Sequence, residues 1–215
     1  MVHSKILIVD DHPLVRLGIR LQLSTQAGLH VCGEAESTAE AMLLAAQHQP
    51  DLMIVDISLK DGHGMDLVKQ VKARHPSVKM LVFSGFEESL YGERYLRAGA
   101  SGYLNKQESN KELLKAIRMV LDGHRYVSEE LARRLISQAL GAPVEAKEPI
   151  EQLSDRELQV FRMIGQGLAS GAIAGRLHLS THTIDTHREN IKRKIGARDG
   201  ADLMRMAVQW VLENG

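Results

Sequence analysis

Several apolar stretches of strand length end abruptly on polar residues that are able to do chemistry. In "DLMIVDISLK" four apolar residues, Leu52 to Val55, lead directly into Asp56, and the run "KILIVD" ends on Asp10, with Asp11 behind it. Carboxylates that lie together bind hard divalent cations such as Mg²⁺. A carboxylate beside such a cation is a suitable nucleophile for a phosphoryl group. The three acids therefore predict a cationic partner, which is either Lys106 or a magnesium ion, and beside the metal Asp56 would be a phosphoryl acceptor.

Two further strand-like runs end on a hydroxyl and on an amine. "KMLVFS" ends on Ser84 and "GYLNK" ends on Lys106. A serine hydroxyl can donate a hydrogen bond to a phosphoryl oxygen, and a lysine can form an ion pair with it. Any one of these residues alone could be an ordinary polar strand end at the surface, but five such residues at the ends of four strands favour a shared site.

The first part of the chain alternates between strand-like runs and segments with helical periodicity. Strands are predicted near residues 5–10, 29–35, 52–56, 79–84 and 102–106, and helices near 13–25, 38–47, 64–74, 88–97 and 109–122. This alternation predicts a parallel sheet with helices on both faces. Ligands bind beyond the carboxyl ends of the strands in such sheets. The polar strand ends should therefore meet at one rim.

Beyond Ser128 the strand-like runs stop. The stretch "SEELARRLISQAL" has the pattern of a connecting helix, and "GAPVEAKEP" (residues 141–149) has the glycine, proline and charge content of a linker. The remainder has helical periodicity throughout. We expect a first domain at residues 1–124, a connecting helix and linker at 125–149, and a second, all-helical domain at 150–215.

The second domain divides into four predicted helices. Ser154 and Glu157 form a capping-box pattern, and Ser180 is a suitable cap for a later helix. Two short helices joined by a tight turn form a helix-turn-helix, whose second helix can enter the major groove of DNA. On that helix the predicted buried side carries Ile184, Ile191 and Ile195. A face that is merely solvated is the alternative for its polar side.

Composition narrows the possible classes of protein. The 215 residues are 44% hydrophobic and carry no formal net charge, so a packed core is expected and no partner is favoured by charge alone. The single cysteine, Cys32, forms no internal disulfide, which is typical of a reducing compartment. The sequence shows neither a secretory signal nor an apolar stretch long enough to span a membrane. We expect a soluble, cytoplasmic protein without a membrane partner.

The stretches "ILIVDDHPLVRLGIR", "DLMIVDISLKDGHGMDLV", "VFSGF" and "GASGYLNKQE" resemble the receiver domain of bacterial response regulators over residues 5–122. The resemblance implies a flavodoxin-like, doubly wound α/β fold with five parallel strands in the order 2-1-3-4-5. It implies that Asp56 accepts a phosphoryl group from a sensor histidine kinase. Lys60 stands where many members of the family carry proline. The other roles that the resemblance implies are Mg²⁺ binding by Asp10, Asp11, Asp56 and the backbone carbonyl of Ser58, a switch pair of Ser84 and Tyr103, and phosphoryl binding by Lys106.

The C-terminal stretch resembles the LuxR-type helix-turn-helix, and the whole chain is similar to the NarL/FixJ subfamily. Asp185 replaces a usually basic residue, Glu189 adds an acid on the same face, and Gly171 stands where a basic residue often contacts phosphate. From residue 149 onward there are nine basic and eight acidic residues, so electrostatic attraction to DNA should be modest. The predicted DNA-binding residues are Thr181, His182, Asp185, Thr186, Arg188, Glu189, Lys192, Arg193 and Lys194.

Within that set the side chains divide by chemistry. The four basic residues are expected to contact phosphate, and either Asp185 or Glu189 is able to accept a hydrogen bond from cytosine N4. A homodimer is expected when the protein is phosphorylated, because two small domains on a palindromic site gain affinity that one lacks.

The expected function is a phosphorylation-switched, DNA-binding transcription regulator and not an enzyme. One alternative is a receiver whose C-terminal domain binds a protein partner, which the acids on the recognition helix would favour. A magnesium-dependent phosphohydrolase is less favoured, because the sequence after Asp56 lacks the second acid of such enzymes. A flavin or nucleotide carrier is also less favoured, because no glycine-rich loop follows the first strand.

Overall fold

The computed structural model describes residues 4–60, 62–140 and 149–214. The chain divides after Ile136 into two compact units, which are described separately below. The predicted linker at residues 141–149 lies outside the described residues, except for Pro149, which begins a short 3₁₀ helix at Pro149–Gln152.

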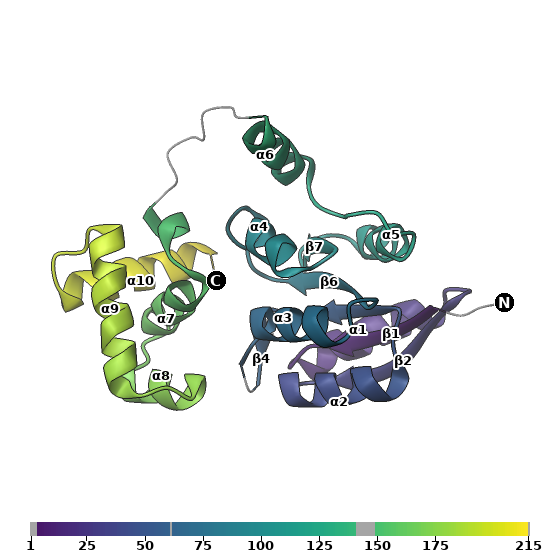
Figure 1. Ribbon diagram of the computed structural model, residues 1–215, viewed down its shortest axis with the longest axis horizontal. Coiled ribbons are helices and arrows are strands. Elements are labelled where there is room, and N and C mark those ends of the chain that lie inside the picture. The colour runs from purple at the N-terminus through teal and green to yellow at the C-terminus, as the bar shows by residue number, and fades with distance from the viewer. Residues whose placement is uncertain (1–3, 61, 141–148, 215) are drawn as a thin grey trace. The chain divides into compact units, whose positions relative to one another are not determined.

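The first unit is built on one parallel sheet (Figure 1). Its strands lie in the order β2-β1-β3-β6-β7, which confirms the predicted order 2-1-3-4-5 once the strands are counted along this sheet. The predicted doubly wound α/β fold is thus confirmed. The strand bounds are β1 Ser4–Val9, β2 Leu29–Ala35, β3 Leu52–Val55, β6 Lys79–Ser84 and β7 Gly102–Asn105.

Helices cover both faces of this sheet. Helices α1 and α5 pack on one face, whereas α2, α3 and α4 pack on the other (Figure 1). The side chains of Ser37 and Ser109 accept hydrogen bonds from the third residues of α2 and α5, so these two helices begin where a serine cap stands. The helix bounds are α1 Pro13–Ser24, α2 Thr38–His48, α3 Gly64–Arg74, α4 Glu88–Ala98 and α5 Asn110–Leu121.

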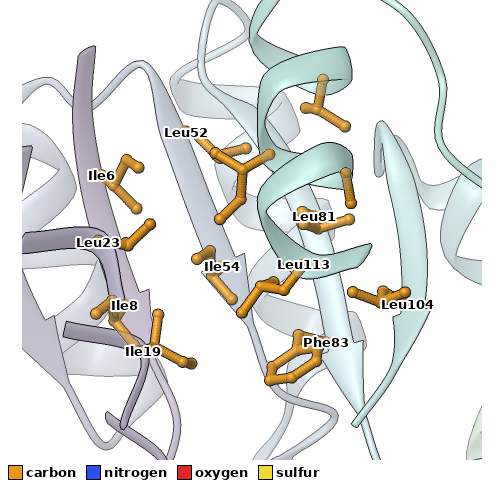
Figure 2. Close-up of a cluster of buried hydrophobic side chains, with 13 residues drawn as sticks. Ile6, Ile8, Ile19, Leu23, Leu52, Ile54, Leu81, Phe83, Leu104 and Leu113 are labelled. Carbon is orange, nitrogen blue, oxygen red and sulfur yellow. The ribbon is translucent and has the colours of Figure 1, made fainter. Parts of the chain in front are cut away.

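The core beneath α1 and α5 is made of aliphatic side chains (Figure 2). Alternate strand residues such as Ile6, Ile8 and Ile54 point to this side, and Leu113 of α5 packs over them. Their neighbours Leu7 and Val55 point to the opposite face and are also fully buried. Because both faces are covered, the central strands β1, β3 and β6 are apolar between their ends, whereas the edge strand β2 also carries His30 and Glu34.

Strand register brings those polar ends to one rim. Val9 of β1 pairs with Val55 of β3, and Val55 pairs with Val82 of β6. The next residues on the first two strands, Asp10 and Asp56, therefore leave the sheet side by side.

A short hairpin, whose two strands have two residues each, follows Asp56 and was not predicted. Strands β4 (Ser58–Leu59) and β5 (Gly62–His63) pair antiparallel. Lys60 donates its backbone N–H to the carbonyl of Glu36, and its Nζ lies 2.6 Å from Glu36 Oε1. The lysine thus ties this loop to the end of β2. The ion pair lowers the pKa of the exposed Glu36 carboxyl.

The second unit is helical. Its helices are α7 Asp155–Gly165, α8 Ser170–Leu177, α9 Thr181–Ile195 and α10 Gly200–Asn214, which confirms the four predicted helices. The predicted capping box at Ser154 and Glu157 and the cap at Ser180 are both present. Phe161 of α7 and Trp210 of α10 meet with ring centroids 5.9 Å apart in the core. The predicted connecting helix is α6, Glu129–Ala139.

Candidate functional site

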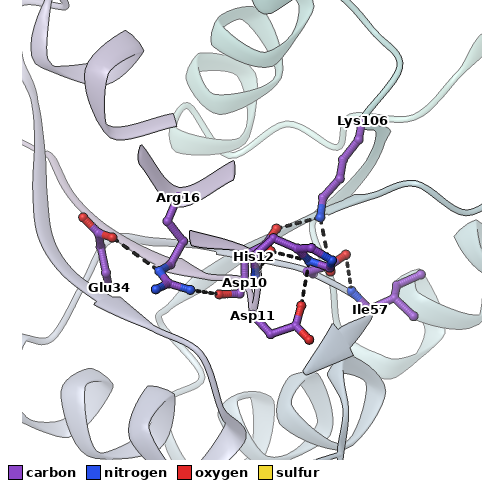
Figure 3. A network of polar contacts seen from close by, with 8 residues as sticks. Asp10, Asp11, His12, Arg16, Glu34, Ile57 and Lys106 are labelled. Atoms are coloured by element: carbon purple, nitrogen blue, oxygen red, sulfur yellow. Dashed lines mark hydrogen bonds and ion pairs between the residues drawn. The ribbon is translucent and has the colours of Figure 1, made fainter. Parts of the chain in front are cut away.

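The rim of the sheet holds two buried carboxylates and one lysine in direct contact (Figure 3). The side chains of Asp10 and Asp56 are 3% and 4% exposed, so neither carboxylate is solvated in the ordinary way. Lys106 Nζ lies 2.6 Å from Asp10 Oδ2 and 3.2 Å from Asp56 Oδ2. The lysine arrives from the end of β7, because its backbone N–H donates to the Ser84 carbonyl. These three predicted site residues are thus brought together.

Asp11 and His12 complete the acidic side of the pocket. His12 Nδ1 lies 2.7 Å from Asp11 Oδ1 and 3.2 Å from Asp10 Oδ1, and the His12 backbone N–H donates to Asp10 Oδ1. His12 is not among the predicted site residues, although it directly follows the two acids. Arg16, on the first turn of α1, donates to the Asp10 backbone carbonyl at 2.6 Å and so fixes the bend after β1.

The donor set suits a hard cation. One ligand atom from each of Asp10, Asp11, His12 and Asp56 lies within 4.8 Å of all the others. Asp11 Oδ1 is buried and accepts no hydrogen bond, although His12 Nδ1 lies 2.7 Å away. A buried carboxylate oxygen without a donor is costly unless a cation or water satisfies it. The carboxylate oxygens therefore fit a divalent metal that prefers oxygen ligands.

Burial dominates the electrostatics of Asp56. Desolvation raises the pKa of its carboxyl, the Lys106 ammonium lowers it, and the neighbouring Asp10 charge raises it again. The Asp56 Oδ1 atom accepts a hydrogen bond of 2.8 Å from the Ile57 backbone N–H, which holds the carboxylate in place. The net upward shift means that ionised Asp56 is less stable in the fold than in water. A cation that binds the ionised carboxylate would offset part of this desolvation cost.

The predicted switch residues, Ser84 and Tyr103, are buried in β6 and β7. Ser84 is fully buried at the end of β6, and the Phe86 backbone N–H points at its Oγ from 3.4 Å. Tyr103 is 1% exposed, and its hydroxyl donates to the Phe86 backbone carbonyl at 2.8 Å. Burial raises the pKa of Tyr103 well above its usual value, so its phenol stays protonated. Ser58 begins the hairpin two residues after Asp56.

Gly64 determines how closely the helix after the hairpin approaches Asp56. A Cβ on Gly64 would overlap the backbone carbonyl oxygen of Asp56, and the Gly64 backbone N–H donates to the Ile57 carbonyl at 2.7 Å. Only glycine fits at this position, since neither backbone can move without displacing the end of β3.

We therefore expect Gly64→Ala to destabilise the first unit by about 1–3 kcal/mol, the usual effect of overpacking a core. Urea denaturation measures this loss. The matched control is Gly18→Ala on α1, where an added Cβ meets no atom within 4 Å. Better helix propensity should make that control more stable, by roughly 1 kcal/mol. Equal effects of the two variants would contradict the role assigned to Gly64.

The polar face of α9 is exposed as predicted. Ile184, Ile191 and Ile195 are buried against the bundle, and Arg188 and Lys192 lie half-buried at the flanks. Glu189 is 71% exposed, and its Oε1 lies 2.7 Å from Lys192 Nζ. The exposed residues of this face are Thr181, His182, Asp185, Thr186, Glu189 and Arg193.

Lys194 differs from the other predicted DNA-binding residues. Its Nζ lies 2.6 Å from Glu157 Oε2, and the Glu157 side chain is only 6% exposed. The same Glu157 oxygen accepts the Ser154 backbone N–H of the capping box at 2.7 Å. Despite desolvation, these hydrogen bonds from Lys194 and Ser154 lower the pKa of Glu157. Lys194 therefore joins α9 to the start of α7 and is directed away from the exposed face.

Comparisons with known proteins agree with this arrangement of two units. Residues 6–118 match the response regulator receiver domain, and residues 151–207 match the bacterial regulatory proteins of the luxR family. The chain is 33% identical to the response regulator GacA of Pseudomonas aeruginosa over 205 residues, 95% of each chain. It is 30% identical to the response regulator UvrY of Escherichia coli over 209 residues, 97% of this chain and 95% of that one.

Solved structures of the response regulator RcsB from Salmonella are similar over nearly the whole length. One has a TM-score of 0.76 at 25% identity and covers 97% of this chain and 98% of its own. Another, in which RcsB is bound to a promoter in the presence of the phosphomimetic BeF₃⁻, has a TM-score of 0.73 at 25% identity and covers 96% and 99%.

Within the described residues, no helix is both long and apolar enough to cross a membrane. The matched families are those of transcription regulators, so the chain is a regulator and not an enzyme. This protein belongs to the family of two-component response regulators that join a receiver domain to a LuxR-type helix-turn-helix domain.

Proposed function

We propose that a sensor histidine kinase transfers a phosphoryl group to Asp56 and thereby switches promoter binding by the helix-turn-helix. The observation that carries this proposal is the contact of Lys106 with both Asp10 and Asp56 at the rim of the sheet. In the transfer, an Asp56 carboxylate oxygen forms a bond to phosphorus. The bond from phosphorus to the donor imidazole nitrogen breaks, and its electron pair stays on that nitrogen.

Mg²⁺ is the proposed cofactor of this step. Asp10, Asp11, Asp56 and the backbone carbonyl of Ser58 would hold it, and it would supply positive charge for the phosphoryl oxygens. Lys106 would then move its ion pair from the two carboxylates to the phosphoryl group. Because Mg²⁺ binds the ionised carboxylate and the Asp56 pKa is raised, we expect Mg²⁺ affinity to fall as the pH is lowered through that pKa.

Ser84 and Tyr103 are the proposed switch pair. A phosphoryl oxygen on Asp56 would accept a hydrogen bond from the Ser84 hydroxyl, which at present lies beside the Phe86 backbone N–H. Tyr103 is held through its hydroxyl to the same residue, Phe86. A movement of the segment between Ser84 and Phe86 would therefore be transmitted to Tyr103 and to the start of α4.

Helix α9 is the proposed reader of double-stranded DNA. Its exposed face would enter the major groove, and two copies of the chain would pair on one promoter site when phosphorylated. The proposed DNA contacts are Thr181, His182, Asp185, Thr186, Arg188, Glu189, Lys192 and Arg193. Lys194 is left out of this set because its ammonium is held by Glu157. A cytoplasmic location follows from the proposed access to chromosomal DNA.

Two neighbouring lysines separate phosphate contact from structural support. Lys192→Ala should weaken binding to all DNA sequences and reduce the slope of log affinity against log salt by about 0.9, the contribution of one phosphate contact. Lys194→Ala should leave that slope unchanged and lower the stability of the second unit, because buried Glu157 loses its partner. Salt titrations of DNA binding and thermal unfolding measure the two effects. A reduced slope for Lys194→Ala would restore it to the contact surface.

Asp185 is the better candidate of the two acids for reading a base. Glu189 is already paired with Lys192, whereas the Asp185 side chain lies exposed on the centre of the face. A carboxylate accepts from cytosine N4 and is repelled by the acceptor edge of guanine. In selections from random duplexes, Asp185→Asn should change the preferred base at one position of each half-site. Glu189→Gln, the matched control, should select the wild-type sequence. An unchanged motif for Asp185→Asn would contradict this assignment.

The proposed function is tested by selecting genomic DNA fragments with the full-length protein, Mg²⁺ and a small phosphodonor. Retention of one motif by the phosphorylated wild type, but not by Asp56→Asn, is expected. If no DNA is retained although Asp56 is phosphorylated, the DNA-binding role is wrong and a protein partner becomes the better candidate.

A further inference from the structure

The residue that follows the two acids after β1 is held firmly at the start of α1. Pro13 restricts His12 to extended backbone, and the φ and ψ angles of His12, −93° and 109°, lie in that region. The His12 carbonyl accepts from the Arg16 N–H at 3.2 Å, and the His12 N–H donates to Asp10 Oδ1 at 2.8 Å. The direction in which the His12 side chain leaves the backbone is therefore fixed.

The imidazole ring of His12 lies beside the acids (Figure 3). Although His12 is the N-cap residue of α1, its side chain forms no capping hydrogen bond. Its Nδ1 atom lies instead 2.7 Å from Asp11 Oδ1 and 3.2 Å from Asp10 Oδ1. The side chain is 63% exposed, so the ring can adjust its position when an ion enters from the solvent.

These separations are close to those between neighbouring ligands of one metal ion. Two ligand atoms at adjacent corners of an octahedron, each about 2.1 Å from the ion, lie about 3 Å apart. The two distances from His12 Nδ1 to carboxylate oxygens fall on either side of this value. Asp11 Oδ1 is buried without a hydrogen bond, so its lone pairs are available to an ion.

Lys106 contacts a different oxygen of Asp10. Its Nζ lies next to Oδ2 of Asp10 and Oδ2 of Asp56, whereas His12 Nδ1 lies next to Oδ1 of Asp10. An ion beside His12 and the ammonium of Lys106 would thus use separate oxygens of the same carboxylate. The donors open to such an ion are one imidazole nitrogen and a set of carboxylate oxygens.

The nitrogen donor determines which ion this set favours. Mg²⁺ prefers oxygen ligands, whereas Co²⁺, Ni²⁺ and Zn²⁺ accept imidazole readily and bind mixed nitrogen and oxygen sites more tightly. We propose that the pocket binds a divalent transition ion of this group more tightly than Mg²⁺, with His12 Nδ1 as a ligand. The inference rests on the magnesium pocket of the proposed function and adds the residue that selects the ion.

Calorimetric titration of the full-length protein with Co²⁺ and with Mg²⁺ tests the selection. His12→Ala should weaken Co²⁺ binding about tenfold or more, at least the effect of losing a group that supports a metal ligand, and should leave Mg²⁺ binding unchanged. His124→Ala is the matched control. His124 is exposed beyond the end of α5, where the Leu121 carbonyl accepts from Lys79 at the start of β6, at the opposite end of the sheet.

A different role for His12 would give the opposite result. If the ring served only as a positively charged partner of the two acids, every cation would compete with it. The variant His12→Ala would then bind both Co²⁺ and Mg²⁺ more tightly than the wild type. Equal gains for the two ions, or unchanged affinity for Co²⁺, would overturn the inference.

X-ray absorption at the cobalt edge identifies the ligand directly. An imidazole ring bound to Co²⁺ adds scattering from its outer ring atoms, which carboxylate ligands do not give. This scattering should be present in the Co²⁺ complexes of the wild type and His124→Ala, and absent from that of His12→Ala. Its absence from the wild type, or its persistence in His12→Ala, would overturn the inference.

Asp11→Asn separates the inference from the function on which it rests. This variant should bind both Co²⁺ and Mg²⁺ more weakly, because Asp11 belongs to the pocket in either case. If it does so while His12→Ala binds Co²⁺ like the wild type, only the inference is wrong. If Asp11→Asn binds both ions like the wild type, the proposed magnesium site is wrong and the inference fails with it.

Discussion

Asp56→Asn should abolish phosphorylation of the protein. The asparagine amide fits the same space but is no nucleophile for phosphorus, and no other carboxylate in the pocket occupies its position beside Lys106 and the Ile57 N–H. Incubation with acetyl phosphate and Mg²⁺ should add the mass of one phosphoryl group to the wild type and none to the variant. Intact-mass spectrometry measures this.

Asp51→Asn is the matched control for this loss. Asp51 directly precedes the same strand, β3, but lies at its opposite end, where its carboxylate accepts the Lys5 backbone N–H at 2.7 Å. It should be phosphorylated like the wild type. A phosphoryl group that still appears on Asp56→Asn would place the acceptor elsewhere.

The same substitution should stabilise the fold at neutral pH. Because the pKa of Asp56 is raised in the folded state, the protonated carboxyl favours folding, and this contribution is lost as the pH rises through the raised pKa. Asparagine stays uncharged at every pH. The free energy of unfolding of Asp56→Asn should therefore exceed that of the wild type by on the order of 1 kcal/mol at pH 7 without Mg²⁺. This difference in stability should vanish below the pKa that the Asp56 carboxyl has in the unfolded chain.

Lys106→Met should destabilise the first unit by about 3 kcal/mol, the usual result of removing one partner from a buried ion pair. Asp10 and Asp56 would then face each other without a cation, although both are almost completely buried. Mg²⁺ should restore much of the loss, because a ligand that binds only the folded state stabilises it. Urea denaturation with and without Mg²⁺ measures both effects.

Lys115→Met is the control for a lysine that pairs at the surface. Lys115 is 59% exposed and lies 3.1 Å from Glu112, so its loss should change stability by less than about 1 kcal/mol. If Lys106→Met is no more damaging than this control, or if Mg²⁺ gives no recovery, the lysine does not compensate the two carboxylates.

The sequence predicted the sheet and its polar rim because both follow from local patterns. Each strand is an apolar run, and Asp10 and Asp56 stand where such runs stop. The parallel order then places them together without knowledge of any side-chain contact. The hairpin after Asp56 was missed because strands of two residues carry no readable alternation.

Contacts between distant residues were beyond the sequence analysis. Helical periodicity places Lys194 near the polar face of α9, and only the folded structure shows that its long side chain reaches Glu157, 37 residues earlier. His12 was missed because it has no metal-binding spacing to another histidine. Its position after the two acids does not by itself mark it as a ligand. The packing of Leu131 in α6 against α4 was missed because Gly92 has no side chain and so leaves the space that the leucine fills. No sequence pattern marks such a space.

One titration tests the central claim most directly: the affinity of the full-length protein for its selected duplex, before and after complete phosphorylation of Asp56. We predict binding about fivefold tighter or more after phosphorylation, and no change when Asp56→Asn receives the same phosphodonor. Equal affinity of the phosphorylated and unphosphorylated wild type would contradict the claim that Asp56 controls DNA binding.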